Sequence, residues 1–110
     1  MSNELIQGLL EFIHLNPTPY HVTDSLVNTG LENGFSLLDE KNAWDLGGGS
    51  GYVVGRNDSS AVMFRCGKNP PWETGFRIAV THGDSPGLRI KNSPEVVNDG
   101  YLRLNTEVYG

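Results

Sequence analysis

The stretch that decides the fold runs from Phe76 to Lys91 and reads FRIAVTHGDSPGLRIK. It opens with a short apolar run, residues 76–81, which predicts a buried strand. His82 and Asp84 follow where this strand would end, and side chains two positions apart point to the same side of an extended chain. A carboxylate beside a metal-binding imidazole fixes its tautomer and raises its basicity. The spacing therefore indicates a histidine–aspartate unit on a stiff mount, although an ordinary strand-end histidine gives the same pattern.

Composition and charge limit the classes of function that the chain can have. It has 110 residues, 37% of them hydrophobic, and a formal net charge of −5, which allows one small domain with a modest core. The eight Lys and Arg residues are scattered, so neither nucleic acid nor an anionic membrane is expected as a partner. No apolar run approaches the roughly 20 residues that span a bilayer, and the N-terminus lacks the basic start of a secretion signal. The single cysteine, Cys66, cannot form an internal disulfide, which fits a cytoplasmic location.

The N-terminal third predicts two helices. Apolar residues fall on one broad face of residues 3–15, and Glu4 lies in the first turn, where the helix dipole favours a negative charge. Asn16 and Pro17 end this helix. Thr18 can then cap a second helix that has Pro19 at its first position, and we expect that helix to end at Gly34.

The remaining segments predict strands and turns. Residues 35–46 are ambiguous between a short extended piece and a helical turn capped by Asp39. Residues 47–51 form a glycine-rich loop that lacks the Gly-Lys-Ser/Thr ending of a phosphate-binding loop, so we interpret it as a connection beside a hairpin. The hairpin itself is predicted from residues 52–54 and 61–66. After a loop at 67–74, the strand at 76–81 and a break at 92–95, residues 101–109 alternate as a half-buried strand. The expected fold class is α/β, with two N-terminal helices packed on a mixed β-sheet.

Four segments of the sequence match, in the same order, segments of a known protein family. They are FIHLNPTPYH at 12–21, LDEKNAWDL at 38–46, AVTHGDSPGLRIK at 79–91 and GYLRLNTEVYG at 100–110. Together they resemble the N-terminal portion of the M18 family of zinc aminopeptidases, in particular the aspartyl aminopeptidase group. The third segment is the most specific of the four. The likeness extends over nearly the whole chain.

This resemblance implies roles for two residues. His82 matches a zinc-ligand histidine of the family, and Asp84 matches the catalytic aspartate that orients this histidine and tunes the metal site. Gly83 stands where the family usually has threonine, which leaves both functional side chains in place. The resemblance further implies two zinc ions in the complete active site, peptide substrates with acidic N-terminal residues, and a large homo-oligomer.

Family members are several times longer than this chain, which limits what it can do alone. The resemblance implies that residues 1–92 are the N-terminal part of a catalytic domain and that 93–110 begin a second, oligomerisation domain. The other metal ligands and the glutamate general base lie beyond the matched region. Zinc in a hydrolytic site needs about three protein ligands, and the chain supplies one, His82. We therefore expect the isolated chain to be an inactive N-terminal fragment.

Other candidate residues have simpler interpretations. His14 and His21 lie at helix ends and are expected to cap or to face solvent, and Cys66 is expected to fill core. Arg89 and Lys91 could attract an acidic substrate, but solvated strand charges are the interpretation that we favour.

Two further hypotheses compete with the peptidase. One is a non-enzymatic module that pairs with another chain through its open C-terminal strand, and the poor solubility or self-association that we expect of the isolated chain has the same cause. The other is an unrelated α/β domain in which His82 and Asp84 are two positions apart by chance.

Overall fold

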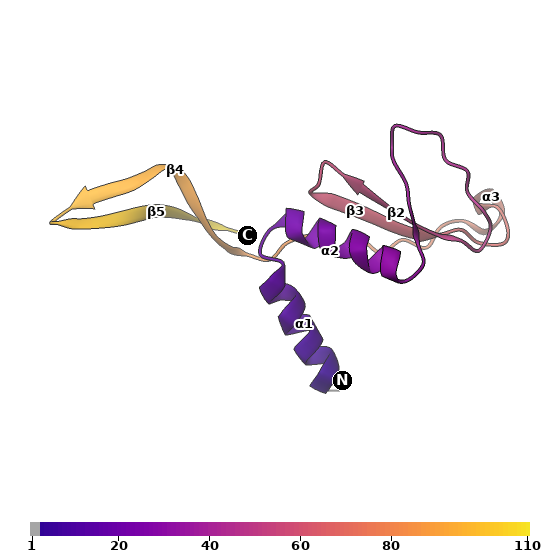
Figure 1. The fold of residues 1–110 in the computed structure, drawn as a ribbon, viewed down its shortest axis with the longest axis horizontal. Helices are drawn as coiled ribbons and strands as arrows, with labels where there is room; N and C mark the ends of the chain where they lie inside the picture. Colours follow the sequence, from indigo (N-terminus) through magenta and orange to yellow (C-terminus); the bar gives the residue numbers. More distant parts are fainter. Residues whose placement is uncertain (1–2) are drawn as a thin grey trace.

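The computed structural model describes residues 3–110, whose arrangement is shown in Figure 1. The helices are α1 (Asn3–Leu15), α2 (Pro19–Glu32) and α3 (Pro71–Thr74). The strands are β1 (Ser36–Leu37), β2 (Gly51–Arg56), β3 (Ser60–Arg65), β4 (Gly87–Asn98) and β5 (Tyr101–Tyr109). Within these residues β1, β2 and β3 form one sheet in that order, and β4 and β5 form a second. The predicted α/β class, helices followed by a mixed sheet, is confirmed.

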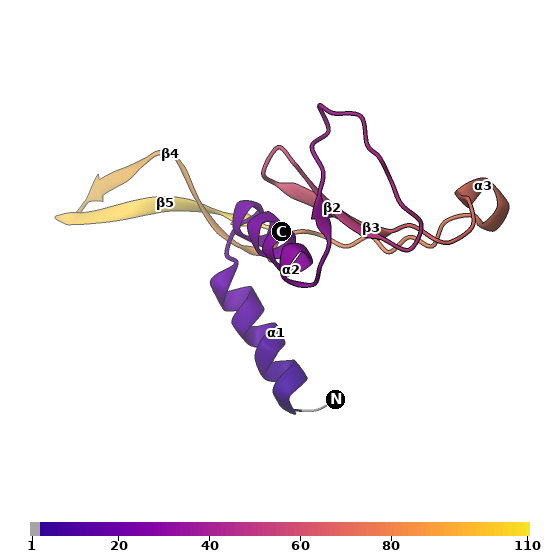
Figure 2. The ribbon, with the colours of Figure 1, turned by 45° about the vertical axis from the view of Figure 1, so that its right-hand side comes forward.

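Helix α1 forms as predicted, but its apolar side chains are exposed. The helix ends where the side-chain amide of Asn16 donates to the backbone oxygen of Phe12 at 2.7 Å. Two views of the ribbon show α1 projecting away from the sheet (Figure 1, Figure 2). Its exposed apolar residues include Leu5, Ile6, Leu9, Leu10 and Ile13. Among residues 3–110, no helix has both the length and the apolar character to cross a bilayer.

The prediction that both N-terminal helices pack on the sheet is wrong for α1, and only α2 packs there. Its start is the predicted one, because Thr18 accepts a hydrogen bond from the backbone N–H of His21 and Pro19 occupies the first turn. The helix ends at Glu32 with Asn33 as its C-cap, close to the predicted end at Gly34. Gly34 adopts a φ of +76°, a conformation that suits glycine. Gly30 allows close contact with β2, since a Cβ there would lie 3.2 Å from Cγ1 of Val53. Val53 is fully buried beneath this helix.

The three-stranded sheet confirms the predicted hairpin. Strands β2 and β3 pair antiparallel, with Val53 opposite Met63, and the turn between them places Asn57 and Asp58 at φ values of 50° and 53°. Both residue types tolerate this left-handed conformation, which hairpin turns require. The ambiguous segment becomes the short parallel strand β1 followed by a turn, in which the carboxylate of Asp39 accepts a hydrogen bond from the backbone N–H of Lys41 at 2.9 Å.

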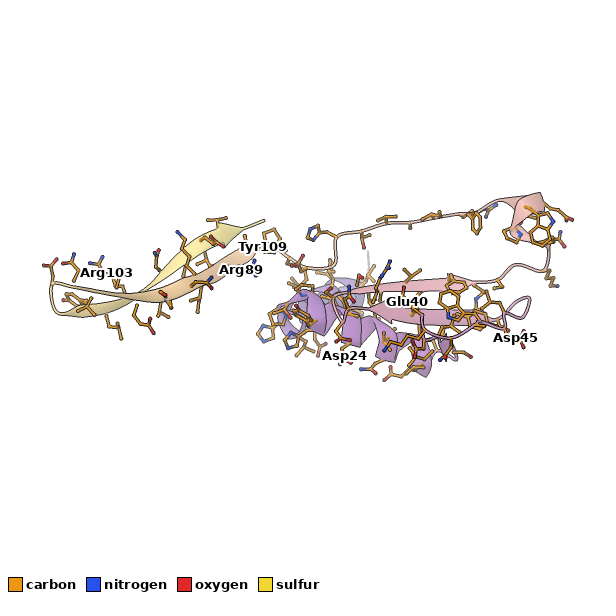
Figure 3. All side chains as sticks on the ribbon, turned by 90° about the horizontal axis from the view of Figure 1, so that it is seen from above. Asp24, Glu40, Asp45, Arg89, Arg103 and Tyr109 are labelled. Carbon is orange, nitrogen blue, oxygen red and sulfur yellow. The ribbon has the colours of Figure 1, made fainter. Side chains whose placement is uncertain are left out.

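The predicted strand at residues 76–81 is wrong for this structure. The segment is an unpaired connection between α3 and β4 (Figure 3), and Phe76, Ile78 and Val80 are between 78% and 87% exposed. A strand needs a neighbour to complete its hydrogen-bond ladder, and no strand among residues 3–110 lies in register beside this one. The loop predicted at 67–74 contains one helical turn, α3, which starts at Pro71.

The C-terminal residues form an antiparallel hairpin that extends away from α2 and the first sheet (Figure 1). Strand β5 confirms the predicted strand at residues 101–109, but the predicted half-burial is wrong, because all nine residues are exposed. It pairs with β4 along one edge, and its other edge is open. The predicted break at 92–95 is wrong, since β4 continues through it with a bulge between Ile90 and Glu95, where Ser93 adopts a φ of 51°. The predicted domain boundary between residues 92 and 93 falls at this bulge and stays a prediction.

Candidate functional site

His82 and Asp84 lie together in the turn that leads from the unpaired segment into β4. The Nδ1 atom of His82 is 2.7 Å from Oδ1 of Asp84 and 3.2 Å from the backbone oxygen of the same residue. Both of these oxygens accept hydrogen bonds, so Nδ1 carries the proton. In the neutral ring the other nitrogen, Nε2, then has a free lone pair, and the imidazole is largely exposed, with 76% of its side chain accessible. This is the state in which a histidine can bind a metal ion.

The backbone that carries His82 and Asp84 differs from the prediction. The sequence predicted the end of a buried strand, whereas the structure has an exposed segment followed by a turn. Nevertheless, the Asp84 side chain is only 6% exposed. The structure thus brings the two predicted site residues into contact, at 2.7 Å, in a turn. Their roles as metal ligand and catalytic carboxylate stay predictions.

A third side chain at the site was not predicted from the sequence. The hydroxyl of Tyr109, at the end of β5, lies beside the Asp84 carboxylate. Hydrogen bonding to this carboxylate and its negative charge raise the pKa of Tyr109 above its ordinary value, while the nearby guanidinium of Arg89 acts to lower it. The Arg89 guanidinium carbon lies 5.8 Å from the centre of the Tyr109 ring. Only the hairpin register, with Gly87 opposite Tyr109, could have revealed this proximity from the sequence.

The remaining candidates do not join this site. The Nδ1 atom of His21 lies 2.7 Å from the hydroxyl of its capping residue, Thr18, in agreement with a role at the helix start. His14 is in the last turn of α1, and Cys66 is a partly buried free thiol beside the first sheet. Among residues 3–110, no three His, Cys, Asp or Glu side chains are grouped as a metal site would require. The residues present fit zinc as one ligand with its orienting carboxylate, and a complete site needs about two ligands more.

An imidazole held by a carboxylate with its second nitrogen free is the arrangement found in metal-dependent enzymes, and comparison with known proteins specifies which. The sequence profile of a family described as "Aminopeptidase I zinc metalloprotease (M18)" matches residues 12–110. The chain belongs to this M18 family.

Individual relatives support the same assignment. The chain is 46% identical over all 110 residues to a "Probable M18 family aminopeptidase 2" of Pseudomonas paraeruginosa, and 48% identical to the protein of that name in Ectopseudomonas mendocina. These matches cover 100% of this chain and 26% of each relative, so the chain spans about a quarter of the length of the curated relatives it matches.

Two solved structures contain the same fold. A chain in the structure titled "Cryo-EM structure of the Ape4 and Nbr1 complex" matches with a TM-score of 0.81 and 39% identity, covering 94% of this chain and 20% of that one. Aminopeptidase I from Borrelia burgdorferi B31 matches with a TM-score of 0.74 and 28% identity, covering all of this chain and 28% of that one. The open arrangement of α1, the first sheet and the β4–β5 hairpin thus recurs inside longer chains.

Proposed function

We propose that this chain is part of a zinc-dependent aminopeptidase that removes N-terminal residues, acidic ones in particular, from peptides. The observation that carries the proposal is the 2.7 Å contact between His82 Nδ1 and Asp84 Oδ1, within the region that matches the family. Support for zinc comes from the family description and from the free Nε2 atom of His82. The preference for acidic residues rests on the resemblance to the aspartyl aminopeptidase group.

The residues of this chain have distinct parts in that reaction. His82 would bind the metal through Nε2, and Asp84 would keep the proton on Nδ1 and the ring in a fixed orientation. Zinc, when bound, supplies an activated water and polarises the peptide carbonyl. Because residues 3–110 group no further ligands with His82, the chain alone is expected to bind zinc weakly and to hydrolyse nothing.

Further parts of the proposal concern the complete protein. Two zinc ions per active site, assembly into a homo-oligomer and a cytoplasmic location are expected from the resemblance and from the single cysteine. Arg89 is an unfavourable candidate for binding an acidic substrate group, because its guanidinium lies over the Tyr109 ring. Lys91, on β4, is exposed.

The proposal is tested by comparing this chain with the full-length polypeptide that carries it. We expect zinc-dependent release of N-terminal aspartate or glutamate from the full-length protein, and no turnover from residues 1–110 alone. His82→Ala in the full-length protein should lower kcat/KM by at least about 1,000-fold, because a first ligand is lost. Zinc content is measured in parallel. Turnover that survives His82→Ala unchanged, or that needs no metal, would refute the assignment.

A non-enzymatic module remains the second candidate, and one observation favours it. Strand β5 has an open edge, and its side chains are exposed along their whole length. An open edge of this kind can pair with another chain. Light scattering of purified residues 1–110 should show a defined dimer that Leu102→Lys, on β5, disrupts. A clean monomer at high concentration would count against both this module and the expected self-association.

A further inference from the structure

Asp84 is buried although its surroundings are open. Its side chain is 6% exposed, whereas that of His82, two residues earlier, is 76% exposed. The end of β5 lies beside this turn, because Tyr109 pairs with Gly87 at the base of the hairpin. The next residue, Gly110, lies so close to the turn that a Cβ on it would be 2.6 Å from Cβ of Pro86. The turn that carries Asp84 and the end of β5 are therefore in direct contact.

Two donors face the Asp84 carboxylate in this arrangement. Nδ1 of His82 lies 2.7 Å from Oδ1, and the Tyr109 hydroxyl lies beside the carboxylate. The guanidinium of Arg89 lies over the Tyr109 ring. Figure 3 shows Tyr109 and Arg89 at the inner end of the hairpin, where β4 joins the preceding segment. The hydroxyl is thus mounted on a paired strand, while His82 and Asp84 belong to a turn.

This difference in mounting has a physical consequence. A carboxylate in a turn can rotate about its terminal bond, and water can compete for the oxygen that His82 does not use. A donor fixed on a strand restricts that rotation and excludes water from one oxygen. Side chains that orient a metal-binding histidine are in turn held by their own hydrogen bonds, and loss of such partners costs about 10- to 100-fold in metal affinity or activity.

We propose that Tyr109 is a positioning residue of the metal site, whose hydroxyl holds the Asp84 carboxylate against His82 and so keeps Nε2 of that histidine presented to the metal. This inference rests on the proposed function, because the role of His82 as a zinc ligand comes from the family. It makes the end of β5, far from His82 in the sequence, a working part of the site. Arg89 lies over the same ring.

The test uses Tyr109→Phe in the full-length protein, a change that removes the hydroxyl and keeps the ring. We expect kcat to fall about 10-fold with KM little changed, and zinc affinity, measured by competition with a chelator, to fall by a similar factor. Tyr101→Phe is the matched control, since Tyr101 lies at the opposite end of the same strand, opposite Asn98, and is largely exposed. This control should match the wild type in both measurements.

A double-mutant cycle with Asp84→Asn separates positioning from a general effect on folding. If Tyr109 acts through Asp84, Tyr109→Phe should have little further effect on zinc affinity once Asp84 is changed. Independent, multiplying effects of the two changes, or a Tyr109→Phe variant equal to the wild type, would overturn the inference and leave the peptidase intact. A wild-type protein without zinc-dependent turnover would instead refute the proposed function itself.

Discussion

The two ends of this molecule are built in opposite ways. Helix α2 and strands β1, β2 and β3 enclose a small core, in which Val53 has no exposed surface and the rings of Tyr52 and Phe64 lie 5.4 Å apart. The segment that follows α3 and the β4–β5 hairpin enclose nothing of the kind, and Val80 and Val108 are more than 80% exposed. Every catalytic candidate lies in this second, open region. The packed region and the candidate site thus lie in different parts of the chain.

The open region has counterparts in longer relatives. The same open arrangement occurs in longer M18 chains, of which the present one covers 20% to 28%. An extended segment with such exposed apolar side chains would not hold one shape by itself, since burial of apolar area supplies most of the stabilisation of a fold. Residues 76–81 and the outer edge of the hairpin therefore leave apolar surface that a packing partner would cover.

Amide hydrogen exchange on residues 1–110 gives the largest contrast between the two regions. Amides of β2 and β3 are hydrogen-bonded in a ladder beneath α2, and they should exchange at least about 100-fold more slowly than those of residues 76–81, which have no ladder. The hairpin amides should lie between the two. Strong protection across residues 76–81 would show that this segment pairs with another part of the chain. The contrast between a packed and an open region would then be wrong.

Local sequence signals were sufficient wherever the interacting residues are neighbours. Thr18 and Pro19 set the start of α2, and Asn57 and Asp58 fit the left-handed turn of the β2–β3 hairpin. The contact between His82 and Asp84 was also predicted from their spacing, although a turn and not a strand end brings them together. In each case the physical cause lies within a few residues, so a pattern in the sequence reports it directly.

Signals failed where the structure depends on distant partners. The apolar run at 76–81 has the composition of a buried strand, but composition cannot show whether a neighbouring strand is present. The polar cluster at 92–95 suggested a break, whereas pairing with β5 carries β4 through it by means of a bulge. Tyr109 was assigned only to a half-buried strand, because its contact with Asp84 depends on the register of the hairpin.

A single substitution in the packed region tests what holds its sheet together. Val53→Ala removes two methyl groups from the fully buried side chain under α2, and it should destabilise this region by about 2 kcal/mol. By the usual conversion this corresponds to about 30-fold faster exchange of the β2 and β3 amides. Exchange in residues 76–81 should not change, because those amides already lack protection.

Val62→Ala is the matched control for this substitution. Val62 pairs with Val54 across the same hairpin, but its side chain is 58% exposed, so the same chemical change should alter stability by no more than about 0.5 kcal/mol. If both variants speed exchange equally, burial beneath α2 is not what holds the first sheet together. If Val53→Ala also speeds exchange in the β4–β5 hairpin by about 30-fold, the two regions unfold as one unit. The two regions would then differ in how exposed their side chains are, but not in their free energy of unfolding.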